Sequence, residues 1–208
     1  MKWRENLVEI YSCGVDGEVL VWQRKTDGKA ADWRCIQTLN SEFNSTCIGI
    51  ASMETKEGVY LAVSDAKANV LLWFKEQGSD DFKRFQSLKL PAQQTPHVLH
   101  FMSHGGPTSS IQCLLIGSVD ARIHVFVTSS FVGGIPNNFI GCGVLSGHEE
   151  WITCLSSKKI GDNTTLLASG SKDFRTRVWR FVTRSSPENG QPRLEEYHDE
   201  ATNDDNDD

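Results

Sequence analysis

The stretch ASGSKDFRTRVW at residues 168–179 decides how this chain of 208 residues folds. A short run of small and apolar residues leads into a turn at Asp173, and a second run beyond the turn closes at Trp179. Two short runs separated by a turn rich in small residues and Asp are typical of a β-hairpin. The stretch therefore predicts two antiparallel strands joined by a tight turn.

The same pattern occurs three more times, at residues 11–22, 61–73 and 115–126. Apolar and polar residues alternate after the turn, as at Val19 and Val21, and a period of two is the signature of a strand. The closing aromatics are separated by 51, 53 and 53 residues: Trp22, Trp73, Phe126 and Trp179. Six residues before the aromatic, three units carry Asp and the second carries Lys67: Asp16, Asp120 and Asp173. Further strand-like runs lie between the hairpins, so the chain is predicted to be all-β with a repeat of about 52 residues.

These units resemble WD repeats, which form the four-stranded blades of β-propellers. The fourth unit shows the fullest match, since Gly147-His148 opens it and Trp179 closes it 31 residues after the histidine. The resemblance implies a hydrogen-bonded chain through four side chains: His148, Ser169, Asp173 and Trp179. Because buried polar groups must be paired, such a chain would fix the geometry of a blade. The second and third units lack the Gly-His pair, and Ile116 replaces the serine in the third.

Counting the closing aromatics predicts about three and a third blades within residues 1–183. The first blade is expected to be a partial one at 7–24, and the others close near 73, 126 and 179. Such an array leaves apolar faces and strand edges uncovered, because blades bury their faces against neighbours. We therefore expect the chain to be a fragment of a larger, seven-bladed propeller.

Three stretches, at 35–40, 120–126 and 145–152, resemble more narrowly the first propeller of the WD-repeat subunits of the Elongator complex. This resemblance implies a scaffold without catalytic activity, whose partners are the large scaffold subunit and the catalytic subunit of a complex that modifies tRNA wobble uridines. Two alternatives stay open: an adaptor in another protein assembly, and a module that binds RNA directly.

The charge of the chain is concentrated at its end. The formal net charge is −6, but residues 190–208 hold eight carboxylates against Arg193, which leaves the remainder close to neutral. Residues 184–208 have the composition of an acidic disordered tail or insertion. A neutral body offers no electrostatic case for nucleic acid or an anionic membrane. The start of the chain lacks the apolar run of a signal peptide, so we expect a cytoplasmic protein, with the nucleus as a second location.

No catalytic, metal or cofactor site is predicted. The stretch HEEWI at 148–152 lacks the second histidine of a zincin, and the six cysteines form no Cys-x-x-Cys pair. His97, His100 and His104 suggest a metal, but 97 and 100 should point to opposite faces of a strand. Ser169, His148 and Asp173 match a hydrolytic triad only in residue type, since the resemblance places them between strands.

A local basic cluster lies near the fourth hairpin and consists of Lys172, Arg175, Arg177 and Arg180. Arg177 stands between Thr176 and Val178, so we expect it to face away from the packed side of its strand. The cluster is either a solvated blade edge or a contact for tRNA phosphates or an acidic partner.

Overall fold

The computed structural model describes residues 7–25, 33–39, 45–91, 94–106, 109–128, 131–132, 135–161, 163–182 and 193–196. Within these ranges all regular structure is β-strand. The strands are β1 (Leu7–Cys13), β2 (Val19–Lys25), β3 (Arg34–Leu39), β4 (Cys47–Glu54), β5 (Gly58–Asp65), β6 (Asn69–Glu76), β7 (Lys83–Lys89), β8 (Pro96–Gly106), β9 (Ser109–Ser118), β10 (Arg122–Thr128), β11 (Phe131–Val132), β12 (Ile135–Pro136), β13 (Ile140–Ser146), β14 (Ile152–Gly161), β15 (Thr164–Ser171), β16 (Thr176–Val182) and β17 (Arg193–Glu196).

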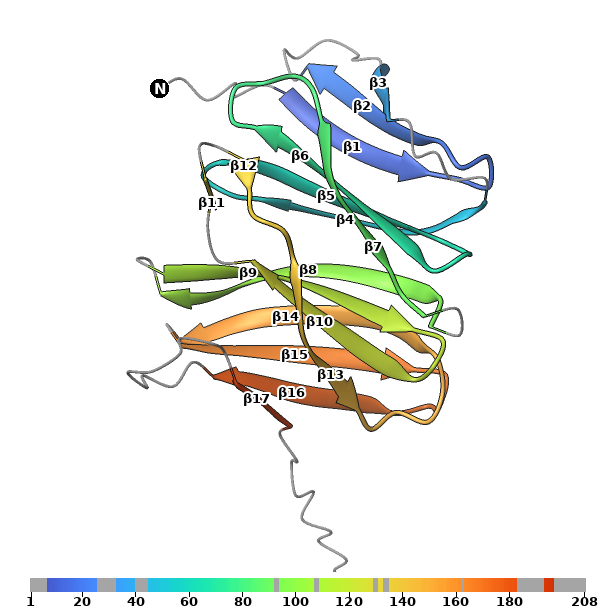
Figure 1. Cartoon of the computed structure of the whole chain (residues 1–208), viewed down its shortest axis with the longest axis vertical. Helices are drawn as coiled ribbons and strands as arrows, with labels where there is room; N and C mark the ends of the chain where they lie inside the picture. The colour runs from blue at the N-terminus through green and yellow to red at the C-terminus, as the bar shows by residue number, and fades with distance from the viewer. Residues whose placement is uncertain are drawn as a thin grey trace, which may run out of the picture.

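Four antiparallel sheets follow one another along the chain (Figure 1). The first unit is β1-β2-β3, the second β4-β5-β6-β7, the third β8-β9-β10-β13 and the fourth β14-β15-β16-β17. The short hairpin β11–β12 is inserted between the last two strands of the third unit. This arrangement confirms the all-β prediction and is that of an open part of a propeller.

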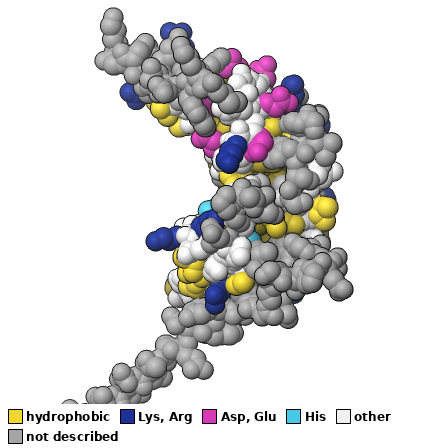
Figure 2. All heavy atoms as spheres, turned by 90° about the vertical axis from the view of Figure 1, so that its left-hand side faces the viewer, with side chains coloured by type: hydrophobic (Ala, Val, Ile, Leu, Met, Phe, Trp, Pro, Cys, Tyr) yellow, Lys and Arg dark blue, Asp and Glu magenta, His cyan; other side chains and the backbone are white. Residues whose placement is uncertain are grey.

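The units are arranged in a crescent with their faces packed together. Strand β8, the first strand of the third unit, contacts both β4 and β14, the first strands of its neighbours. Figure 2 shows the resulting curved body, hollowed on one side. First strands that approach one another while the outer strands diverge are what a radial arrangement of blades requires.

Three apolar cores hold the crescent together, one at each junction. The first lies between the first and second units and includes Val21 and Trp73. The second joins the next pair around Tyr60 and Phe101, and the third surrounds Trp179 between the last two units. A strand in the middle of the crescent is thus covered on both faces, which explains the continuous apolar runs in β5, β6 and β9.

The hairpin turns share one backbone geometry. The residue after the Asp position has a left-handed φ in every unit: 77° at Gly17, 65° at Ala68, 65° at Ala121 and 63° at Phe174. A register shift also occurs just before the closing aromatic in the first three units, where the outer strand pairs with Trp22, Trp73 and Phe126. The closing aromatic therefore marks a bulge against the outer strand as well as the end of the hairpin.

Two elements extend beyond the sequence-based expectation. Strand β3 pairs with β2, so the first unit contains more than the hairpin expected at 7–24. Strand β17 pairs with β16 inside the range 184–208, which was expected to be an acidic disordered tail or an insertion. Strand β17 occupies the outer position that β3, β7 and β13 occupy in the other units. The edge of β16 offers unpaired backbone groups, and β17 pairs with them. The rest of 184–208 lies outside the described residues.

Candidate functional site

The fourth unit contains a continuous hydrogen-bonded chain of side chains. His148 lies in the loop before β14, and its Nδ1 is 2.7 Å from Asp173 Oδ2 in the turn between β15 and β16. Its Nε2 is 2.8 Å from Ser169 Oγ on β15. The indole N–H of Trp179 on β16 donates to the same Ser169 oxygen at 2.8 Å. The structure therefore brings together all four residues that the WD resemblance indicated.

Asp173 organises the loop and the turn at one end of the unit. Its carboxylate also accepts hydrogen bonds from the backbone N–H groups of Glu149, at 3.1 Å, and Arg175, at 2.8 Å. Burial raises the pKa of Asp173, but the bonds from His148 and from these two amides outweigh it and hold the pKa below its ordinary value. Because a carboxylate only accepts, His148 Nδ1 must donate, and a neutral imidazole then accepts the Ser169 proton at Nε2.

The first unit repeats one part of this chain. Trp22 Nε1 donates to Ser12 Oγ at 2.9 Å, as Trp179 does to Ser169. Asp16 accepts from the backbone N–H of Glu18 at 3.0 Å, which closes the turn. Ser12 was not among the site residues predicted from the sequence, although it lies ten residues before Trp22, the same spacing as Ser169 from Trp179.

In the second unit another carboxylate takes over the role of the missing turn Asp. Asp65, two residues before Lys67, accepts from the backbone N–H groups of Lys67 at 3.0 Å and Asn69 at 2.7 Å. It also accepts from Ser45 Oγ at 2.6 Å. Burial raises the pKa of Asp65, but these hydrogen bonds lower it overall. The second unit thus keeps an Asp-capped turn, with the cap moved to the end of β5.

The third unit is capped more weakly. Asp120 accepts from the N–H of Arg122 at 3.2 Å and lies 3.7 Å from His124 Nε2. Phe126, which closes the unit, has no polar atom to offer and only packs against the core between the second and third units. The turn residues and closing aromatics predicted from the sequence therefore all lie in hairpins. Among the described residues, only the fourth unit has the complete hydrogen-bonded chain of histidine, aspartate, serine and tryptophan.

Two glutamines each connect the outer strand of one unit to the residue just before the outer strand of the next. The Gln86 side chain on β7 donates to the backbone oxygen of Phe139 at 2.9 Å and accepts from its N–H at 2.7 Å. Gln37 on β3 makes the same pair with Phe82, at 3.3 and 3.0 Å. We call these two contacts the glutamine clasps. Each imitates a bridge between strands, and no sequence motif indicated either one.

The three histidines of β8 all contact the fourth unit. His97 meets the Trp151 ring edge-on, with centroids 5.9 Å apart. His100 Nε2 lies 2.8 Å from Ser157 Oγ, and His104 Nδ1 lies 3.0 Å from Thr165 Oγ1. The expectation that 97 and 100 point to opposite faces was wrong, because a register shift between Pro96 and Val98 interrupts the alternation. These histidines join two units, and burial lowers the pKa of both His100 and His104.

Three members of the basic cluster, Lys172, Arg175 and Arg177, contact other residues of the chain, while Arg180 is exposed. Lys172 Nζ lies 3.5 Å above the centre of the Trp151 ring, and Arg175 pairs with Glu149 at 3.1 Å. Arg177 was expected to face away from the packed side, and this was wrong. It shares a strand face with the buried Trp179, two residues on, and its guanidinium lies against Gly147. A Cβ placed on that glycine would be 3.1 Å from the guanidinium carbon.

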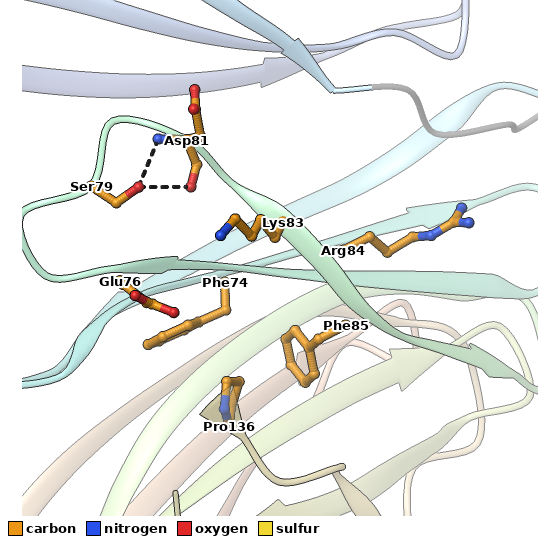
Figure 3. Close-up of a pocket in the computed structure, with 8 residues that line it drawn as sticks. All are labelled: Phe74, Glu76, Ser79, Asp81, Lys83, Arg84, Phe85 and Pro136. Atoms are coloured by element: carbon orange, nitrogen blue, oxygen red, sulfur yellow. Dashed lines mark hydrogen bonds between the residues drawn. The ribbon is translucent and has the colours of Figure 1, made fainter. Parts of the chain in front are cut away.

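A cavity of about 210 Å³ lies at the outer side of the second unit (Figure 3). Phe74, Phe85 and Pro136 supply its apolar walls, and Pro136 comes from the inserted hairpin β11–β12. Charged groups from the end of β6, from the β6–β7 loop and from β7 surround them: Glu76, Asp81, Lys83 and Arg84. The lining contains neither histidine nor cysteine, and its one hydroxyl, that of Ser79, is hydrogen-bonded to the backbone of Asp81. The cavity has the size and the apolar walls to hold one apolar side chain of a partner.

Two further properties concern only the residues that the structure describes. Among them, no three His, Cys, Asp or Glu side chains cluster in a way that could hold a metal ion. The same part of the chain includes no helix long and apolar enough to cross a membrane.

Comparisons with known proteins agree with the geometry. Residues 141–180 match the family described as WD40, the WD domain or G-beta repeat. Three relatives are named Elongator complex protein 2: that of Dictyostelium discoideum is 24% identical over 203 residues, that of Danio rerio 26% over 180, and that of Schizosaccharomyces pombe 27% over 173. These matches cover 90%, 86% and 83% of this chain but only 22%, 20% and 20% of the relatives, so the chain spans about a fifth of their length.

A solved structure shows the same fold. The crystal structure of Saccharomyces cerevisiae Sqt1 matches with a TM-score of 0.57 at 15% sequence identity, over 85% of this chain and 42% of that one. At this identity the likeness concerns the fold alone. Together with the family match, it confirms the WD-repeat resemblance.

Proposed function

We propose that this WD40-repeat chain, distantly related to Elongator complex protein 2, is a non-catalytic scaffold segment that binds other proteins. The observation that carries the proposal is the rigid attachment of exposed turns to closely packed units. Hydrogen bonds of Asp173 hold the turn 171–175 in place within the fourth unit. Each sheet packs against the next through an apolar core. Such a body holds loops in fixed positions for partners.

The geometry around Ser169 supports the non-catalytic part of the proposal. Its side chain has no exposed surface, and its oxygen is shared between His148 and the indole of Trp179. A nucleophile must reach the substrate and must be able to give its proton to a free base. Here the base and the hydroxyl are fixed inside the unit, so the Ser/His/Asp set serves to join strands.

The relatives support a finer proposal about the assembly. Because they are named as proteins of the Elongator complex, we propose that this chain supports assembly of such a complex. Its partners would be the large scaffold subunit and the catalytic subunit that the sequence resemblance implies, in the cytoplasm and also in the nucleus. The chain spans about a fifth of the length of these relatives, so the role of the whole relative is proposed, and not established, for this chain.

Co-purification tests both levels of the proposal. The endogenous protein is tagged at its N-terminus, purified gently from source cells, and its partners are measured by quantitative mass spectrometry together with the mass of the tagged protein. We expect Elongator subunits in amounts comparable to the tagged protein. A different stable set of protein partners would reject the Elongator assignment and keep the scaffold, whereas recovery of no protein partner would reject both.

A further inference from the structure

Phe174 has no role in the fold of the fourth unit. The side chain is fully exposed, although phenylalanine is among the most costly residues to leave in water. It also has a left-handed φ of 63°, a conformation that favours glycine. The other three units have Gly17, Ala68 and Ala121 at this place, each a small residue. The fold therefore needs only a small residue here, and the ring must be explained in another way.

The backbone that carries Phe174 is fixed on both sides. Asp173 precedes it and is held by His148 Nδ1 at 2.7 Å. Arg175 follows it and donates its N–H to Asp173 Oδ1 at 2.8 Å, while the N–H of Asp173 donates to Ser171 Oγ at 3.1 Å. An exposed ring on such a turn loses little freedom when it is bound, which is the property of an anchor residue.

The groups around Phe174 form an apolar and charge-balanced surface, which we call the fourth-unit rim. It consists of Glu149, Glu150, Trp151, Lys172, Phe174 and Arg175. Trp151 keeps 39% of its surface exposed and stacks beneath the Lys172 ammonium at 3.5 Å. The two cations are matched by two carboxylates, and one pair, Arg175 and Glu149, is in direct contact at 3.1 Å.

We propose that Phe174 is an anchor that inserts into an apolar cavity of a protein partner, with the fourth-unit rim forming the surrounding contact. The proposal rests on the proposed scaffold function and assigns one of its contact sites. The partner cavity must accept a phenyl ring and carry acceptors and donors of both signs at its edge, because the rim presents both signs. A polar rim around a buried aromatic is the usual anatomy of a protein–protein contact.

The same observations disfavour RNA as the occupant. A surface that binds phosphates gains its affinity from an excess of cations, and the rim has none, since Glu149 and Glu150 balance Lys172 and Arg175. Lys172 is already stacked on Trp151, and Arg175 is already paired with Glu149. Phosphates would therefore compete with Trp151 and Glu149 for these two cations.

Site-specific cross-linking in source cells tests the proposal on the full-length protein. One variant carries Phe174→p-benzoylphenylalanine, and a matched control carries Val15→p-benzoylphenylalanine. Val15 is an exposed apolar residue in the corresponding turn of the first unit. After irradiation and denaturing purification, we expect a discrete protein adduct at 174 that is absent at 15. An adduct with RNA at 174, or adducts equal at both positions, would overturn the proposal.

A second measurement uses co-purification of Phe174→Ala, with Val15→Ala as control. Truncation of an anchor should lower recovery of the cross-linked partner by about tenfold or more, while the control leaves it unchanged. Neither variant should lower the melting temperature, because neither side chain is packed. If Phe174→Ala keeps every partner, the anchor is rejected and the scaffold stands. If the wild type itself recovers no protein, the proposed function fails.

Discussion

Replacing Gln86 by Met should destabilise the junction between the second and third units. The side chain keeps its length but loses the donor and the acceptor that contact the Phe139 backbone at 2.9 and 2.7 Å. Phe139 is only 2% exposed, so its N–H and C=O would stay buried without partners. Each orphaned group costs about 1–3 kcal/mol, and burial of the thioether offsets part of this loss. We expect the free energy of unfolding to fall by about 2–3 kcal/mol.

Urea unfolding followed by tryptophan fluorescence measures this change, and a thermal scan gives a second reading. For a chain of about 200 residues, the expected loss lowers the melting temperature by roughly 5–10 °C. Gln77→Met is the matched control, because Gln77 lies in an exposed turn. Gln37→Met should fall between the two, since its bonds to Phe82 are longer, at 3.3 and 3.0 Å.

The reasoning would be refuted if Gln86→Met and Gln77→Met agreed to within about 0.5 kcal/mol, the usual range of surface substitutions. The glutamine clasps would then contribute nothing beyond what water provides. A larger loss for Gln37→Met than for Gln86→Met would instead contradict the ranking by hydrogen-bond length.

Three further substitutions test the polar contacts. Ser169→Ala should lower the unfolding free energy by about 2–4 kcal/mol in denaturant titration, against about 1 kcal/mol for the more exposed Ser12→Ala; equal losses would contradict a special role for the fourth-unit chain. Because the pKa of Asp173 is lower in the folded than in the unfolded chain, its carboxylate stabilises the fold at any pH above the unfolded-state pKa. This stabilisation is lost as the pH falls through the folded-state pKa, so the unfolding free energies of wild type and Asp173→Asn should converge in an acid titration. Burial and Lys159 lower the pKa of His104, so stability should fall as pH drops below 6.5, and the slope should be shallower in His104→Gln by up to about 1.4 kcal/mol per pH unit.

Local patterns were sufficient to predict the hairpins. The turn residues and the closing aromatic lie within twelve positions of one another, so their spacing predicts each hairpin. The contacts of His148 with Asp173 and of Ser169 with Trp179 were implied by the resemblance to WD repeats and not by the spacing. The same spacing rule could have found Ser12. Asp65 was harder to find, because the cap had moved two residues from the expected position and only the backbone hydrogen bonds show that it serves the same turn.

Contacts between units could not be predicted in this way. The glutamine clasps depend on where the outer strands of two units come close, 45 and 53 residues apart along the chain. The orientation of the β8 histidines could be predicted only with knowledge of the register shift between Pro96 and Val98. Such a shift moves the side chains on one side of it to the opposite face of the sheet. The prediction for Arg177 was wrong for a simpler reason: its facing was inferred from its neighbours Thr176 and Val178 instead of from Trp179, which is buried.

The four turns separate what the fold requires from what it permits. The first three reach the left-handed geometry with Gly17, Ala68 and Ala121, which are small residues. The fourth reaches it with Phe174, which costs more in this conformation, and His148, Asp173 and the neighbouring amides hold this turn in place. Strained backbone persists only where the surroundings over-determine it. The hydrogen-bonded chain thus does more than join strands, since it keeps an unfavourable residue in a fixed and exposed position.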